Sequence, residues 1–87
     1  MDITLKQSAI DDLKRLTANS DRRKKLLDSF VKKINLGKYE RLTGDKLGFL
    51  CKARSGPYRA VFAIEGKDRA IIIRSGDRKE VYRKLQR

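Results

Sequence analysis

The pattern of apolar and polar positions divides the chain into regular elements. Residues 2–6 alternate between the two kinds, which predicts a short first strand. Residues 9–18 and 21–36 carry apolar side chains at helical spacing, so two consecutive helices are expected. Three further strands and a short final helix are predicted at residues 49–54, 58–64, 69–74 and 78–86. This order predicts an α+β fold: a small antiparallel sheet of about four strands, with the two N-terminal helices packed on one face.

Polar and turn-forming residues indicate where these elements begin and end. Ser8 and Ser20 precede the two long helices and are the expected N-caps. Gly37 follows the second helix and is expected to end it. Residues 38–48 contain two glycines and are predicted to be a loop. The Ser75-Gly76-Asp77 segment is expected to end the last strand and to cap the final helix.

The strands are expected to turn one face toward the helices. In the strand at 58–64, Tyr58, Ala60, Phe62 and Ile64 fall on one side, and Arg59, Val61 and Ala63 fall on the other. In the strand before it, Phe49, Cys51 and Ala53 share a side, with Leu50, Lys52 and Arg54 opposite. The arginines and the lysine therefore lie on the face away from the two helices.

The register of these two strands bears on their chemistry. If Ala53 pairs with Tyr58 across a four-residue loop, Lys52 pairs with Arg59. Like charges opposed across two strands repel each other, so this register indicates that an anion binds between them. The alternative is a register displaced by one residue, with both side chains extended into water.

Length and charge restrict the partners of the protein. The 87 residues are expected to form one domain, 1–87. Twenty-three Lys and Arg outnumber eleven Asp and Glu, for a formal net charge of +12. A folded body with this charge attracts nucleic acid or an acidic protein, although high charge also keeps a small domain soluble. The helix at 21–36 has a basic face that either binds phosphates or is simply solvated; its residues are Arg22, Arg23, Lys25, Lys32 and Lys33.

Metal and membrane chemistry are not expected. The chain has no histidine and one cysteine, Cys51, which excludes an intrachain disulfide and makes a zinc site improbable. Without a histidine to activate it, Cys51 is predicted to be a small core residue and not a nucleophile. We find no segment long enough to span a bilayer and no signal sequence, which favours a cytoplasmic location. No cofactor is predicted.

Two short motifs resemble a known family. They are Gly56-Pro57-Tyr58-Arg59-Ala60-Val61-Phe62 and Gly76-Asp77-Arg78-Lys79-Glu80-Val81-Tyr82. Together with the order of elements, they resemble the RelE/ParE superfamily of toxins from bacterial toxin–antitoxin systems, over roughly Ile3 to Tyr82. The second motif is more similar to the RelE branch, whose members are ribosome-dependent endoribonucleases (mRNA interferases) that cut mRNA in the ribosomal A site. The ParE branch instead poisons DNA gyrase.

The resemblance implies a set of site residues. Carried over by position, the catalytic residues are Lys52, Arg59, Arg78 and Tyr82. Further RNA contacts are expected at Arg54, Lys79, Arg83, Lys32 and Lys33. Leu50 stands where well-known members carry the first lysine of a Lys-x-Lys pair, so the general base is left open.

The implied reaction is metal-independent attack by the RNA 2′-hydroxyl. Arginines stabilise the charge on phosphorus through their rigid fork of donors. Lys52 would be the base or would give electrostatic support. Tyr82 would orient the substrate or stack on a base, unless its ring only packs on the sheet.

The implied partners are mRNA on the 70S ribosome, at the A site and the 16S rRNA, and a cognate antitoxin. Two other functions fit the same residues. One is non-catalytic inhibition of DNA gyrase, as in the ParE branch. The other is a basic RNA-binding or ribosome-binding protein that blocks translation without cutting.

Overall fold

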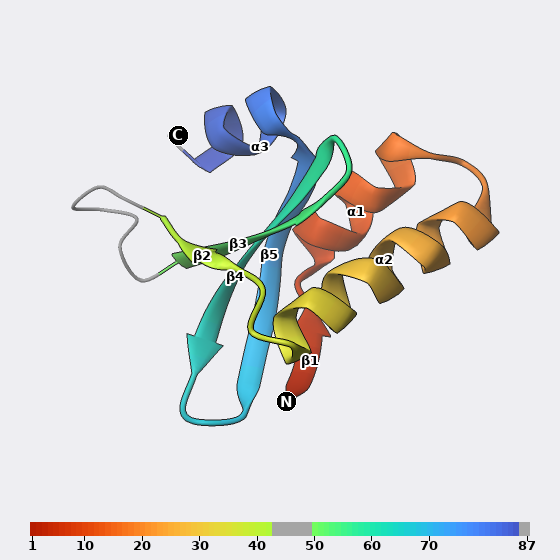
Figure 1. Cartoon of the computed structure of the whole chain (residues 1–87). Helices are drawn as coiled ribbons and strands as arrows, with labels where there is room; N and C mark the ends of the chain where they lie inside the picture. The colour runs from red at the N-terminus through yellow and green to blue at the C-terminus, as the bar shows by residue number, and fades with distance from the viewer. Residues whose placement is uncertain (43–49, 86–87) are drawn as a thin grey trace.

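The computed structural model describes residues 1–42 and 50–85, and it has two helices on one face of a sheet and one helix on the other (Figure 1). The elements in chain order are β1 (Asp2–Leu5), α1 (Gln7–Leu16), α2 (Ser20–Asn35), β2 (Glu40–Arg41), β3 (Leu50–Ser55), β4 (Tyr58–Glu65), β5 (Arg69–Asp77) and α3 (Arg78–Leu85). The predicted α+β fold is confirmed. Turns predicted within residues 43–48 and the facing of Phe49 lie outside the described residues. No helix in the described part of the chain combines the length and apolarity needed to cross a membrane.

The sheet differs from the prediction in its edges. It has five strands in the order β1-β5-β4-β3-β2, one more than expected. The extra strand, β2, lies in the segment predicted as loop, because two residues are too short to show an alternating pattern. At the other edge, β1 pairs with β5 in parallel and not antiparallel, since the chain crosses over through α1 and α2 before it returns.

The strand β5 is longer than predicted. It continues through Ser75 and Gly76 to Asp77, where the sequence indicated a break. Ser75 pairs with Ala60 of β4, and Gly76 pairs with Arg59. The pairing with β4 provides hydrogen-bond partners for backbone N–H and C=O groups that would lack them in a loop.

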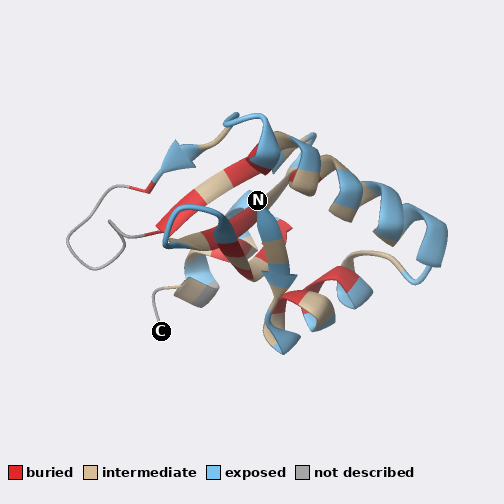
Figure 2. Ribbon diagram, turned by 90° about the horizontal axis from the view of Figure 1, so that it is seen from below, coloured by how far each residue is buried: buried red, intermediate tan, exposed pale blue. Residues whose placement is uncertain are grey.

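The predicted facing of the strands is confirmed. Ala53, Ala60 and Phe62 pack against α1 and α2 in the larger core cluster. Val61 faces the other way, into a smaller cluster with Val81 of α3. Figure 2 shows the buried residues concentrated in the strands and along the inner side of α1. The two sides of the sheet therefore hold two separate apolar clusters.

Both predicted serine N-caps are wrong. Ser8 lies inside α1, and its hydroxyl donates to the Ile73 carbonyl at 2.7 Å, which joins the helix to β5. Asn19 caps α2, since its side-chain oxygen accepts from the backbone N–H groups of Asp21 at 2.9 Å and Arg22 at 3.1 Å. Asn19 and Ser20 are both acceptable caps, so composition alone does not select between them, whereas α1 begins after Lys6 without a side-chain cap. The predictions for Gly37, with φ of 73°, and for Asp77, which accepts from Glu80 N–H, are confirmed.

A buried polar cluster links α1 to β5. The Asp12 carboxylate accepts a hydrogen bond from Arg74 Nη2 at 3.1 Å, which is also an ion pair, and another from the Ser75 backbone N–H at 3.1 Å. The Ser75 hydroxyl donates to the Ala9 carbonyl at 3.3 Å. Asp12 is 2% exposed, so its charge depends on these partners.

Cys51 is buried on β3, as expected for a small core residue. Burial raises the pKa of its thiol, and the neighbouring Arg41 offsets part of that rise. A raised pKa leaves less thiolate at a given pH, so we expect native protein at pH 8 to react with a thiol reagent more slowly than the urea-unfolded chain. Equal rates in the two states, followed by absorbance with a chromogenic disulfide, would contradict this placement.

Candidate functional site

The β3–β4 hairpin has a register two residues away from the prediction. Ser55 pairs with Tyr58 around a two-residue turn, and Gly56 in that turn has φ of 59°. Glycine adopts this left-handed conformation readily, so the hairpin closes more tightly than a four-residue loop would. Arg54, and not Lys52, is therefore directly opposite Arg59. A shift of two residues preserves the side-chain faces, so all three cations still share the face away from α1 and α2.

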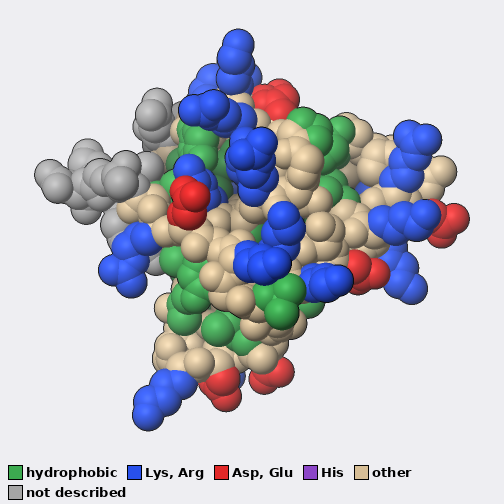
Figure 3. Space-filling view, in the orientation of Figure 1, with side chains coloured by type: hydrophobic (Ala, Val, Ile, Leu, Met, Phe, Trp, Pro, Cys, Tyr) green, Lys and Arg blue, Asp and Glu red, His purple; other side chains and the backbone are tan. Residues whose placement is uncertain are grey.

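An open cleft of about 500 Å³ lies on this face of the sheet. It is lined by Gly37, Lys38, Tyr39, Glu40, Lys52, Arg54, Arg59, Arg78 and Tyr82. The structure thus brings together the four residues assigned as catalytic by the resemblance, and Arg54 with them. Figure 3 shows Lys and Arg side chains gathered near α3 and the hairpin, with acidic atoms among them.

The helix α3 is held over the sheet by a close contact at Gly76. A Cβ at this position would meet Val81 Cγ2 at 3.2 Å, and Gly76 has φ of 155°. A larger residue here would adopt a strained backbone conformation and crowd Val81, which packs fully buried against the sheet, so glycine suits this position. Since Asp77 starts the helix immediately afterwards, Arg78 and Tyr82 are brought to the rim of the cleft.

Lys52 lies between an acidic and an aromatic side chain. Its Nζ is 3.6 Å from Glu40 Oε2 and 5.7 Å from the centre of the Tyr82 ring. The Glu40 side chain is 78% exposed, whereas that of Lys52 is 31% exposed. Tyr82 also packs against the smaller core cluster, so its ring is both a wall of the cleft and a packing group.

Glu40 was not among the predicted site residues, because it lies in the segment predicted as loop. The β2–β3 pairing places Glu40 directly opposite Lys52. Lys38 and Tyr39, also unpredicted, precede it along the same wall, and Tyr39 makes an edge-to-face contact with Phe62 at 5.1 Å between ring centres. The one available signal was the position of an isolated acidic residue just after a helix.

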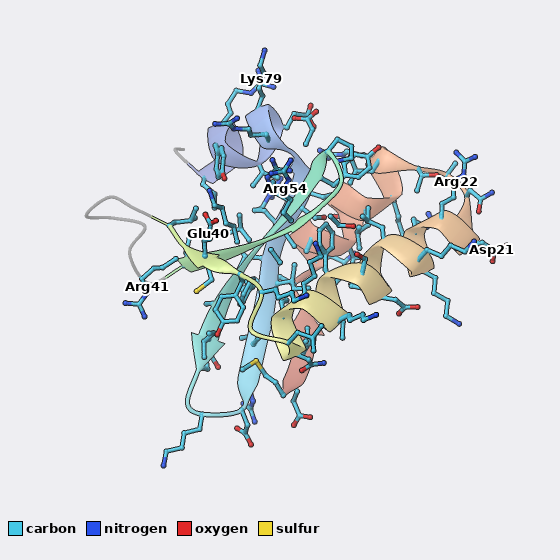
Figure 4. The ribbon with its side chains drawn as sticks, in the orientation of Figure 1. Asp21, Arg22, Glu40, Arg41, Arg54 and Lys79 are labelled. Atoms are coloured by element: carbon cyan, nitrogen blue, oxygen red, sulfur yellow. The ribbon has the colours of Figure 1, made fainter. Side chains whose placement is uncertain are left out.

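Among the residues that the structure describes, the arginines of the cleft have no acidic partner. Arg59 Nη1 donates to two carbonyls of its own turn, Tyr58 O at 3.1 Å and Gly56 O at 3.3 Å. Within residues 1–42 and 50–85, Arg54, Arg59 and Arg78 form no ion pair with a carboxylate. Figure 4 shows Arg54 beneath α3, between that helix and the strands. These guanidinium groups can donate to an anion that enters the cleft.

The other predicted RNA contacts lie outside the cleft lining. Lys79 is exposed on α3 and points away from the sheet in Figure 4. Arg83 is also exposed, and its Nη2 is 4.0 Å from Glu80. Lys32 and Lys33 belong to α2, in the helical layer on the opposite face of the sheet. A single RNA segment in the cleft would not touch all of these groups.

The described residues contain no cluster of three or more acidic or cysteine side chains that could hold a metal ion. The described residues that line the cleft offer guanidinium and ammonium donors, the Glu40 carboxylate as an acceptor and the phenol rings of Tyr39 and Tyr82.

No protein-family model matches this chain, and neither does any curated protein. Its fold is nevertheless similar to solved structures. The RelBE2 toxin–antitoxin complex from Mycobacterium tuberculosis has a chain with 20% identity and a TM-score of 0.70, over 88% of this chain and 96% of the other. A YoeB/ParE toxin from Agrobacterium tumefaciens has 20% identity and a TM-score of 0.67, over 88% and 98%.

A third similar structure comes from an archaeon. The RelB–RelE antitoxin–toxin complex from Methanococcus jannaschii has a chain with 19% identity and a TM-score of 0.61, covering 94% of this chain and 98% of the other. The likeness spans nearly the whole length on both sides, as the sequence resemblance implied. The chain has the fold of the RelE-type toxins of toxin–antitoxin systems.

Proposed function

We propose that this protein is the toxin of a toxin–antitoxin system and cuts mRNA in the ribosomal A site. The observation that carries the proposal is the convergence of Lys52, Arg59, Arg78 and Tyr82 on one cleft. They come from β3, β4 and α3, so they lie up to 30 residues apart in sequence. A cleft rich in arginine suits the phosphodiester backbone.

The proposed reaction breaks the bond between phosphorus and the 5′-oxygen. The RNA 2′-oxygen attacks phosphorus and loses its proton to a base, while the 5′-oxygen leaves and gains a proton. The products are a 2′,3′-cyclic phosphate and a 5′-hydroxyl end. Arg59 and Arg78 donate to the phosphate oxygens as negative charge develops there. Tyr82 supports a base or ribose at the rim of the cleft.

We assign the role of proton acceptor to Glu40 and electrostatic support to Lys52. An ionised carboxylate has only acceptor positions, whereas an ammonium group has only donors. Because Lys52 is paired with Glu40 at 3.6 Å, it is placed to offset negative charge beside the reacting atoms. This assignment supplies a base although Leu50 replaces a lysine of the family pattern.

The ribosome and an antitoxin are the proposed partners. The formal charge of +12 favours docking on RNA, with the A site and the 16S rRNA orienting the mRNA. Two of the similar structures are toxin–antitoxin complexes, which supports an antitoxin that covers the toxin. The proposed location is the cytoplasm, where the ribosomes are.

Primer extension on a defined mRNA in a purified translation reaction tests the proposal. Wild-type protein should produce breaks within A-site codons that require ribosomes. The Arg59→Ala/Arg78→Ala variant should cut at least about 100-fold more slowly, because donors to the transition state are lost.

The matched control is Lys14→Ala/Lys24→Ala, which removes two exposed charges from α1 and α2 on the opposite face of the sheet and should keep cutting. Intact mRNA with translation blocked would show a ribosome binder that does not cut. Intact mRNA with normal translation would overturn the proposal, and DNA gyrase supercoiling would then be assayed.

A further inference from the structure

We propose that Arg54 and Arg59 form a two-arginine clamp that binds one phosphate group of the RNA chain. The clamp adds Arg54 to the groups that touch the substrate. Its identification with RNA rests on the proposed function, but the anion site itself rests on the geometry of the β3–β4 hairpin.

The two arginines are fixed side by side by the backbone. Arg54 and Arg59 are directly paired across the antiparallel strands β3 and β4, and the four residues between them form the end of the hairpin. Directly opposed residues have Cβ atoms about 4.5–5.5 Å apart, and both side chains leave the same face of the sheet. The guanidinium groups therefore reach the cleft as a pair, independently of any bound partner.

This pair is electrostatically unfavourable in the free protein. Two other cations of the sheet have acidic partners: Lys52 pairs with Glu40, and Arg74 pairs with Asp12. In the part of the chain that the structure describes, Arg54 has neither an ion pair nor a side-chain hydrogen bond, and Arg59 donates only to its own turn. Like charges directly opposed on two strands destabilise a sheet, and a bound anion would reverse that effect.

A phosphate group is the anion that suits this arrangement. Each planar guanidinium can donate two parallel hydrogen bonds to oxygens of a tetrahedral phosphate. The cleft of about 500 Å³ has room for a nucleotide around that phosphate, and Tyr82 on its rim offers a ring for the base.

The test compares Arg54→Gln with a control of equal charge change, Lys24→Gln, at an exposed position of α2 in the opposite layer that is not among the predicted RNA contacts. Thermal unfolding is measured at low ionic strength, with chloride or with inorganic phosphate at matched ionic strength. Without phosphate, Arg54→Gln should melt at a higher temperature than wild type because the repulsion is removed. Phosphate should raise the melting temperature of wild type and Lys24→Gln, and most of that rise should disappear in Arg54→Gln.

A second measurement uses a short 2′-O-methyl oligoribonucleotide, which cannot be cleaved by 2′-hydroxyl attack. Its affinity, from fluorescence anisotropy, should fall about tenfold in Arg54→Gln and less than about threefold in Lys24→Gln. Neither assay needs ribosomes or cleavage. A failure of the nuclease proposal would therefore leave the clamp untouched, and a failure of the clamp would leave the nuclease proposal untouched.

Three outcomes would overturn the clamp. One is an equal phosphate response in wild type and Arg54→Gln, which would indicate general screening by a basic surface. Another is lower stability of Arg54→Gln in phosphate-free buffer. The third is a glutamate-rich peptide that stabilises wild type through Arg54 when phosphate does not, which would make the pair a site for a protein carboxylate.

Discussion

We expect the Glu40→Gln variant to cut mRNA about 10² to 10⁴ times more slowly than wild type, the usual contribution of a general base. The substitution keeps the size of the side chain but removes the carboxylate of the cleft. Glu40 is largely exposed, and its one ion pair within the described residues is with Lys52, so folding should be nearly unchanged. The measurement is the single-turnover rate of A-site cleavage on programmed ribosomes, with binding to those ribosomes measured in parallel.

The matched control for this prediction is Glu65→Gln, which removes an equal charge from an exposed position at the end of β4. It should cut at the wild-type rate. Lys52→Met tests the alternative assignment of the base, and we expect it to slow cleavage less than Glu40→Gln does. If Glu40→Gln cuts normally while Lys52→Met is inactive, Lys52 is the base and the assignment made here is wrong.

Replacement of the buried Asp12 by alanine should destabilise the protein by about 3 kcal/mol. The variant leaves Arg74 without its carboxylate and the buried Ser75 N–H without an acceptor. The Arg74 side chain is 25% exposed, so water partly compensates for the lost partner. The loss of stability should therefore lie at the lower end of the range typical for removing one partner of a buried ion pair. Since Asp12 joins α1 to β5, the loss affects the whole fold.

Urea unfolding followed by circular dichroism measures this effect as a lower midpoint at an unchanged slope. The neighbouring Asp11→Ala is the control, because Asp11 is exposed and accepts one hydrogen bond, from Gln7. Its unfolding free energy should change by less than about 0.5 kcal/mol. Similar losses in Asp11→Ala and Asp12→Ala would show that the buried cluster contributes little.

Periodicity alone was sufficient for most of the fold. The helical stripe of α2, with Phe30 and Ile34 both 1% exposed, and the alternation around Phe62 each reflect burial on one side of an element. Because side chains repeat every 3.6 residues on a helix and every two on a strand, that burial is recorded locally in the sequence. The cap at Asp77 and the stop at Gly37 are also local, and both were predicted.

The local sequence pattern does not indicate which distant segments pair with each other. The register that pairs Arg54 with Arg59 requires a positive φ at Gly56. That conformation shortens the hairpin loop from the predicted four residues to two. The alternation is the same in either register, so sequence placed both arginines on the correct face but not opposite each other. The parallel partner of β1 likewise depends on how the chain crosses the sheet.

The sequence by itself determined the helices, four of the five strands, the faces of those strands and the basic character of the protein, because each of these depends on residue type and local spacing. Only the tertiary structure brought Glu40 to Lys52, and Arg54 to Arg59 beneath α3, into one cleft. The physical reason is that hydrogen bonding between strands, and the close approach of Val81 to Gly76, set distances between residues that no local pattern contains.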